Sequence, residues 1–246
     1  MATDRAILIV FTFATASLAR ADVITSFSGS TLVVIGDDTA DAVQIQSASD
    51  GVSVVGVDGT LVDGSSASVT LPAVQRLTVK LGRGADRLTI RHLDLARKLD
   101  VHAGSGNDRV VLNGVRAGWT HIVTNDGNDR VSIEESSRFT RLAVDTGDGD
   151  DLVLLDTVRI SSDLDVVTRE GDDDVDVVAT DVGDDVDVEL GDGDDEVVLT
   201  DVAFHDDTDL DGGSGDDEAF FFGCVWIGGD MDAGGFGDDG WWWFGL

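Results

Sequence analysis

Short stretches of alternating apolar and polar residues recur about every 22 positions along most of this 246-residue chain. In each stretch two apolar residues stand two positions apart, as do Leu88 and Ile90, or Val110 and Leu112. Alternation with period two, rich in β-branched residues, is typical of a half-buried β-strand. The pattern therefore predicts one strand per repeat whose two apolar side chains face inward.

A second apolar pair precedes the first one in most repeats, for example Leu77 and Val79 or Leu164 and Val166. A third apolar position follows at Leu93, Val115, Val158 and Val202. Three inward positions per repeat, without the 3.6-residue period of a helix, favour a coil of parallel strands. We therefore predict an all-β fold, a right-handed parallel β-helix or β-roll-like solenoid, with its handedness taken from that of parallel crossover connections.

One aspartate marks each repeat of the regular array. These aspartates stand 22 residues apart at every step except one of 21, at Asp86, Asp108, Asp129, Asp151, Asp173, Asp195, Asp217 and Asp239. Glycines precede them, as in Gly104-Ser-Gly-Asn-Asp108. Glycine permits positive φ and close backbone approach, so each phrase predicts a tight turn at one edge of the coil. A weaker copy of the phrase ends at Asp41, 45 residues before Asp86.

Three segments are predicted along the chain. Residues 1–21 read as an export signal that ends in Ala19-Arg20-Ala21, with cleavage after Ala21. Residues 22–80 form irregular N-terminal coils that cap the array, and residues 81–246 form the regular solenoid with an aromatic C-terminal end. These features predict a secreted or cell-surface protein. Cys224 is the single cysteine, so no internal disulfide is possible.

The charge is distributed very unevenly. The formal net charge is -33. Residues 1–141 carry 14 Lys and Arg against 16 Asp and Glu, whereas residues 142–246 carry 2 against 33. Such a surface repels nucleic acids and attracts cations or basic partners.

Aspartates stacked in one column would repel one another, because like charges 4 Å apart cost about 1 kcal/mol in water and about 4 kcal/mol at an effective dielectric of 20. A divalent cation between turns would relieve that repulsion, and oxygen ligands suit Ca²⁺. The four histidines show no ligand spacing along the sequence, which disfavours Zn²⁺.

The turns resemble the glycine- and aspartate-rich nonapeptide G-G-x-G-x-D-x-U-x of the repeats-in-toxin (RTX, hemolysin-type) family, best in Gly212-Gly-Ser-Gly-Asp-Asp217-Glu-Ala-Phe220. The resemblance implies an exported bacterial protein that binds several Ca²⁺ ions between successive coils. It implies metal ligation by the eight repeat aspartates and by the turn glycines Gly147, Gly149, Gly191, Gly193, Gly213 and Gly215. The chain departs from the family by having one such turn per 22 residues. Arginines flank the early turns, so occupancy should be strongest from Asp151 onward.

The leading functional hypothesis is a non-enzymatic structural or adhesive solenoid that binds Ca²⁺. The alternative is a polysaccharide lyase or hydrolase, or a binder of acidic polysaccharide through the stacked Arg87, Arg109 and Arg130. A further possible partner is another protein, bound at the aromatic C-terminal end. A break in the repeat that could hold paired catalytic carboxylates is not visible in the sequence.

Overall fold

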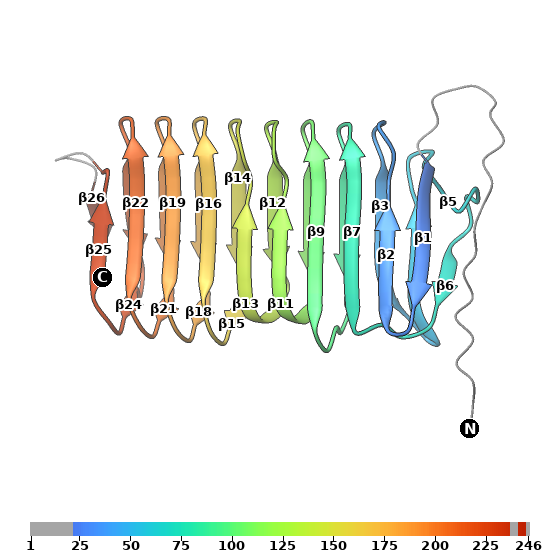
Figure 1. The fold of residues 1–246 in the computed structure, drawn as a ribbon. Helices are drawn as coiled ribbons and strands as arrows, with labels where there is room; N and C mark the ends of the chain where they lie inside the picture. The colour runs from blue at the N-terminus through green and yellow to red at the C-terminus, as the bar shows by residue number, and fades with distance from the viewer. Residues whose placement is uncertain (1–21, 237–240, 245–246) are drawn as a thin grey trace.

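A computed structural model describes residues 22–236 and the backbone of residues 241–244 as a rod of stacked β-coils, with no helix in the described part (Figure 1). The rod has about seven turns of about 22 residues. The predicted signal peptide and its cleavage site lie outside the described residues. Nowhere in the described segments is there a helix long and apolar enough to cross a membrane.

Two sheets form the two broad faces of the rod. Sheet 1 has 15 strands: β1 (Asp22–Ser28), β2 (Thr31–Ile35), β5 (Leu61–Val62), β7 (Arg76–Arg83), β9 (Lys98–Ser105), β11 (Arg116–Val123), β13 (Arg138–Asp145), β15 (Arg159–Ile160), β16 (Leu164–Glu170), β18 (Asp181–Val182), β19 (Val186–Asp192), β21 (Ala203–Phe204), β22 (Thr208–Ser214), β24 (Trp226–Ile227) and β25 (Met231–Gly234). Sheet 2 has 11 strands: β3 (Ala42–Ala48), β4 (Gly51–Gly56), β6 (Val69–Leu71), β8 (Arg87–Arg91), β10 (Arg109–Asn113), β12 (Arg130–Glu134), β14 (Leu152–Asp156), β17 (Asp174–Val178), β20 (Glu196–Thr200), β23 (Glu218–Phe222) and β26 (Trp241–Phe244).

Each regular coil runs along sheet 1, turns, and returns along sheet 2. In Figure 1 the near strands β7, β9, β16, β19 and β22 point upward, the return strands run downward behind them, and the chain advances from right to left. That path is right-handed, which confirms the predicted winding. Successive coils pair in parallel and in register. Equivalent residues of neighbouring coils therefore lie side by side, with Leu88 opposite Val110 and Ile90 opposite Leu112.

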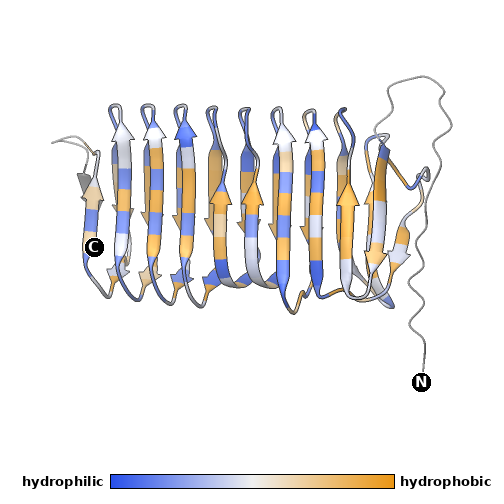
Figure 2. Cartoon of the chain, in the orientation of Figure 1, coloured by the Kyte–Doolittle hydropathy of each residue, from blue (hydrophilic) through white to orange (hydrophobic). Residues whose placement is uncertain are grey.

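The core consists of columns of aliphatic side chains between the two sheets. Both predicted apolar pairs point inward, and Leu77, Val79, Leu88 and Ile90 are fully buried. Alternation along each strand places polar residues on the outer faces, which appear as alternating orange and blue segments in Figure 2. One column is interrupted, because the buried Thr120 stands between Leu99 and Leu142.

The third apolar position also faces the core. Val115 and Val158 are buried, and two-residue strands follow it in the later coils. Buried Ile160, Val182 and Phe204 stack there across β15, β18 and β21. The predicted short strand or corner is therefore present, and each coil packs three inward-facing segments.

The N-terminal segment combines one regular coil with a cap. β2 pairs in parallel with β7 and β3 with β8, so residues 31–48 already follow the solenoid path. β1 is antiparallel to β2, and β4 is antiparallel to both β3 and β6. These antiparallel strands cover the end of the rod, which would otherwise offer two unpaired strand edges. They also account for the 45 residues between Asp41 and Asp86.

Large apolar side chains become exposed toward the other end of the rod. Trp226 is 51% exposed, and Phe222 and Met231 are also exposed. Cys224 is exposed and free. The backbone of β26 extends sheet 2 beyond β23.

Candidate functional site

The repeat aspartates lie where the chain turns from sheet 1 into sheet 2. We call this edge the Asp corner; it comprises residues 82–86 and their equivalents in the later coils. Seven predicted ligands, Asp86, Asp108, Asp129, Asp151, Asp173, Asp195 and Asp217, lie there with 1–3% of their surface exposed. Asp41 occupies the same position in the first coil and is 1% exposed. Asp239 lies outside the described residues.

Hydrogen bonds join these aspartates into a continuous ladder. The backbone N–H of each one donates to Oδ1 of the aspartate in the next coil. The N···O distances are 2.6 Å from Asp41 to Asp86, 2.8 Å from Asp86 to Asp108, 2.6 Å from Asp108 to Asp129, 2.7 Å from Asp129 to Asp151, 2.7 Å from Asp151 to Asp173, 2.8 Å from Asp173 to Asp195 and 3.0 Å from Asp195 to Asp217. The side chains thus satisfy buried backbone donors at a turn where the strand ladder is interrupted.

The second carboxylate oxygen of each described repeat aspartate is buried and has no partner with hydrogen-bond geometry. These atoms are Oδ2 of Asp86, Asp108, Asp129, Asp151, Asp173, Asp195 and Asp217. In three coils a threonine five residues earlier lies near the carboxylate and lowers its pKa, without completing a hydrogen bond to Oδ2. A buried carboxylate oxygen without a partner is costly, so the corner favours a proton or a cation at Oδ2.

Burial is the main cause of raised pKa values throughout the ladder. The pKa rises from the ordinary 3.8 to about 6 in Asp86, Asp129 and Asp173. It rises to about 7 in Asp108, Asp151 and Asp195, where neighbouring ladder carboxylates add to the effect of burial. The backbone hydrogen bond to Oδ1 opposes the shift in each case but does not cancel it.

The predicted turn glycines are required by the close approach of successive coils. Gly149 has φ +132°, and a Cβ on it would lie 2.4 Å from the carbonyl oxygen of Gly127. The other predicted glycines also have positive φ and would place a Cβ within 2.1 Å of a carbonyl oxygen in the preceding coil: Gly147, Gly191, Gly193, Gly213 and Gly215. The glycines therefore bring backbone carbonyl oxygens to the Asp corner.

A second column of side chains lies outside the ladder. This outer column consists of the residues immediately before the repeat aspartates: Asn107, Asn128, Asp150, Asp172, Asp194 and Asp216. Four of its side chains accept at Oδ1 from the backbone N–H of the following coil, which is the direction opposite to that of the ladder, whereas Asn128 donates from Nδ2 to Asp150 Oδ2. The distances are 3.2 Å from Asn128 to Asn107, 3.2 Å from Asp172 to Asp150, 3.0 Å from Asp194 to Asp172 and 2.9 Å from Asp216 to Asp194.

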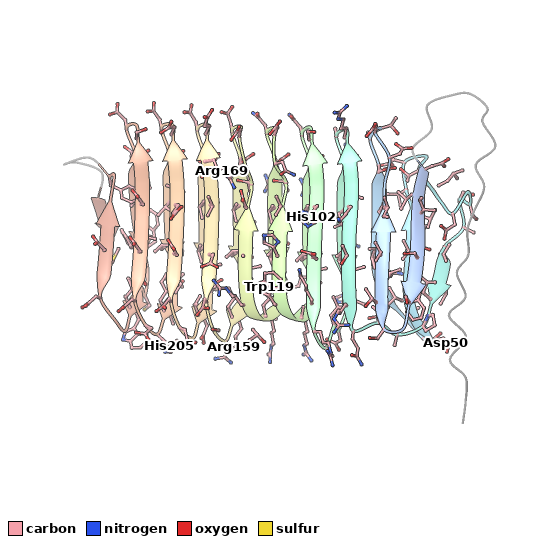
Figure 3. The ribbon with its side chains drawn as sticks, in the orientation of Figure 1. Asp50, His102, Trp119, Arg159, Arg169 and His205 are labelled. Carbon is pink, nitrogen blue, oxygen red and sulfur yellow. The ribbon has the colours of Figure 1, made fainter. Side chains whose placement is uncertain are left out.

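The outer column changes character along the rod. Its acids are exposed, and in the described part of the chain no lysine or arginine pairs with Asp172, Asp194 or Asp216. Arg169, labelled in Figure 3, is the one cation in a late turn, and it pairs with Asp145. In the early coils, by contrast, the first residues of the sheet 2 strands β8, β10 and β12 are arginines that stack in register: Arg87, Arg109 and Arg130. This places the arginines as the sequence predicted.

Two groups of potential ligands were missed by the sequence analysis: the exposed Asp185, Asp206 and Asp207, and a group that contains two histidines. Asp100 and His102 on β9 and His121 on β11 place one ligand atom each within 4.8 Å of one another. The histidines show no ligand spacing along the sequence, whereas the fold brings His102 and His121 to the same carboxylate. The relevant spacing is between coils: His121 pairs with Asp100 across a 21-residue step. A polar pair separated by one coil length is the sequence signal that would have identified this group.

No protein-family model, no curated protein and no solved structure matches the chain. The likeness to calcium-binding repeats consequently rests on the residues of the corner itself.

Proposed function

We propose that this protein is a non-enzymatic structural or adhesive solenoid whose Asp corner binds Ca²⁺ between successive coils from Asp150 onward. The proposal extends to an exported protein that becomes fully stable where Ca²⁺ is abundant. Its supports are the acidic outer column, the unpartnered oxygens beneath it, and the resemblance of the turns to RTX repeats.

The observation that carries the proposal is a comparison within the outer column. Asn107 accepts the same backbone hydrogen bond from the next coil as Asp150, Asp172 and Asp194 do. The backbone hydrogen bond therefore does not require a negative charge at this position. The late coils nevertheless carry aspartate at four successive positions, so their charge requires a different explanation.

The charge is unfavourable unless it is compensated. Neighbouring strands lie about 4.8 Å apart, and two unit charges at that distance repel by about 1 kcal/mol in water and about 3 kcal/mol at an effective dielectric of 20. Asp148, Glu170 and Asp192 line up beside the outer column and add further negative charge. A bound cation converts this repulsion into attraction.

The donors present suit Ca²⁺. The corner offers carboxylate oxygens from both columns and backbone carbonyl oxygens at the glycines, and Ca²⁺ accepts six to eight oxygen ligands at flexible angles. The residues that would hold it are Asp151, Asp173, Asp195, Asp217 and their outer-column neighbours. When bound, the ion would supply positive charge and ligand bonds between coils, and because it binds the folded state it would stabilise that state.

Calorimetric titration of the purified protein with CaCl₂ tests the proposal. We expect several ions per chain and a stoichiometry close to the number of gaps between acidic coils. The double variant Asp172→Asn/Asp194→Asn keeps the backbone hydrogen bonds and should lose at least one ion per chain. Absence of calcium binding by the wild-type protein would refute the proposal.

A matched control separates a specific site from general acidity. Asp187 and Asp209 also stack across one coil step, on the strands of sheet 1 away from the corner. Asp187→Asn/Asp209→Asn removes the same charge and should leave the number of bound ions unchanged. If both double variants lose calcium equally, the ions respond to net charge and the corner is not the site.

A second candidate function is supported by a shallow hollow of about 350 Å³ beside the opposite corner. Arg116, Arg138 and Arg159 stack in register along it, and Thr140 and Ser161 also line it. Arg159 is labelled in Figure 3 at the lower edge of the rod, and it also pairs with Asp181. A column of arginines at the strand spacing fits repeated carboxylates of an acidic polysaccharide.

Retention on immobilised polygalacturonate in a salt gradient tests this second function. We expect the triple variant Arg116→Ser/Arg138→Ser/Arg159→Ser to elute at lower salt than the wild type. The control variant Arg87→Ser/Arg109→Ser/Arg130→Ser loses the same charge elsewhere and should elute at higher salt than the first variant. Equal elution of both variants would exclude the hollow as the specific site. Assaying the eluted protein for release of unsaturated or reducing sugar ends would distinguish a binder from a lyase or hydrolase.

A further inference from the structure

We propose that Asp100, His102 and His121 bind one divalent first-row transition metal ion of the kind represented by Zn²⁺. The three residues lie on the outer face of sheet 1, on the strands that lead into the Asp corner, and two adjacent coils contribute to the site. Asp100 and His102 alternate on β9, and His121 stands opposite Asp100 on β11. Figure 3 labels His102 and Trp119 on this face of the rod.

The distances between the ligand atoms are those of a metal site. Asp100 Oδ1 lies 3.4 Å from His121 Nδ1 and 3.6 Å from His102 Nε2. Both separations are longer than the 2.7–3.2 Å of a good hydrogen bond. Zinc bonds to nitrogen and oxygen of about 2.0–2.1 Å imply tetrahedral ligand separations of about 3.3–3.4 Å. The two separations from Asp100 Oδ1 thus match the edge length of a zinc tetrahedron, and the ligand atoms of the three residues all lie within 4.8 Å of one another.

The carboxylate is oriented toward the histidines but is not satisfied by them. Asp100 Oδ1 is buried and has no hydrogen-bond partner, whereas Lys98 Nζ holds Oδ2 at 3.0 Å. Lys98 is itself fixed, because its Nζ lies 4.0 Å from the centre of the Trp119 ring. Lys98 therefore fixes the carboxylate through one oxygen, and the other oxygen lies 3.4–3.6 Å from a nitrogen of each imidazole, where a metal ion could contact all three groups.

The imidazoles are also positioned and prepared for ligation. Trp119 stacks on His121 with the ring centres 5.6 Å apart and the planes 6° from parallel. The ring of His102 lies edge-on to that of His121, with the ring centres 6.0 Å apart. Histidine ligates a metal through a neutral imidazole nitrogen, and both rings present one nitrogen to Asp100 Oδ1. Two histidines and one carboxylate leave a fourth position open, as in zinc sites that retain a water.

The site lies where the regular array is interrupted. The step from Asp108 to Asp129 is the single 21-residue step, and Thr120 interrupts the apolar column in that coil with a buried hydroxyl that has no partner. His121 is the next residue along β11. A metal bridging β9 and β11 would join this coil to the preceding one through the outer face.

Calorimetric titration of the purified protein with ZnCl₂, in CaCl₂ sufficient to occupy the acidic corner, tests the proposal. We expect one Zn²⁺ per chain for the wild type. His121→Ala, His102→Ala and the size-conserving Asp100→Asn should each weaken binding by at least about tenfold, since even removal of an outer-shell partner costs 10–100-fold. Co²⁺ in place of Zn²⁺ should give the visible absorption of a tetrahedral site in the wild type and not in His121→Ala.

His205 provides a matched control within the same chain. Its Nε2 lies 3.4 Å from Asp181 Oδ1 and its ring contacts Trp226 with centres 4.8 Å apart, but no second histidine completes the group. His205→Ala should therefore bind Zn²⁺ like the wild type. The proposal is overturned if the wild type binds no Zn²⁺, or if folded His121→Ala and His205→Ala, verified by far-UV circular dichroism, bind it equally. Neither result bears on calcium at the Asp corner.

Discussion

Without calcium, this protein should become less stable as the pH rises from 5 to 8. The cause is the ladder of buried aspartates, whose pKa values in the folded state lie at about 6 or about 7. In the unfolded chain the same groups titrate near 3.8, so between these values the folded state binds more protons. Stability is therefore highest when the folded ladder is protonated, and it falls as pH rises through the folded pKa values.

The magnitude follows from the size of the shifts. One pKa unit corresponds to about 1.4 kcal/mol, so complete ionisation of Asp129 costs the fold about 3 kcal/mol and that of Asp151 about 4 kcal/mol. These costs are not additive, because ladder carboxylates interact. Even one of them is large beside a typical stability of 5–15 kcal/mol. Burial lowers the pKa of His102, which acts in the opposite sense, since it makes stability rise with pH.

Urea unfolding followed by circular dichroism at pH 5, 6, 7 and 8, in a chelator, measures the effect. Asp151→Asn retains an acceptor at Oδ1 and cannot ionise, so it should flatten the pH dependence and raise stability at pH 8 by as much as about 4 kcal/mol. Asp150→Asn changes the adjacent exposed residue and should alter the slope much less than Asp151→Asn, because the charge of Asp150 adds only a minor part to the raised pKa of Asp173. Added Ca²⁺ should restore stability at pH 8, by about 2.7 kcal/mol per site at a concentration of 100 Kd. Stability that is constant or increasing from pH 5 to 8 in chelator would refute the reasoning.

Three further predictions concern packing and assembly. Thr120→Val should raise the free energy of unfolding by about 1–2 kcal/mol in urea melts, because it removes a buried hydroxyl without a partner from an aliphatic column. Gly149→Ala should lower it by more than about 2 kcal/mol, through both positive φ and the clash with Gly127, whereas Gly59→Ala, with positive φ and open space, should cost only about 1 kcal/mol. Trp226→Ser should reduce self-association in sedimentation velocity experiments if the exposed aromatic end binds other molecules, and an unchanged profile would argue against that role.

The repeat period was sufficient to predict the register of the strands, because a solenoid places residues that are one coil length apart side by side. Leu88 and Val110 could be paired from their spacing alone, and they are paired in the structure. Strand direction could not be predicted in this way. The residues of β4 alternate like those of any other strand, yet β4 runs antiparallel to β3, since period two carries no information on direction.

The repeat period also decides which candidate sites could be found from the sequence. Asp86 and its equivalents were found because they recur at the coil length, but their burial was not foreseen. A turn rich in glycine and aspartate suggests an exposed loop, whereas here the backbone N–H of the preceding coil draws Oδ1 inward. Asp100 and His121 carry no motif along the chain. They are recognisable as neighbours only after the coil length is applied to polar residues as well as to aliphatic ones.

The two columns of the corner differ in how their charge can be removed. The inner ladder is buried, and its raised pKa values allow protons to neutralise it at mildly acidic pH. The outer column is exposed to solvent, and in the described part of the chain no lysine or arginine pairs with Asp172, Asp194 or Asp216. A cation that contacts both columns would replace the inner protons as it compensates the outer charge. Calcium affinity at the corner should therefore increase with pH, and binding should release protons, most strongly in the coils of Asp151 and Asp195, where both conditions meet.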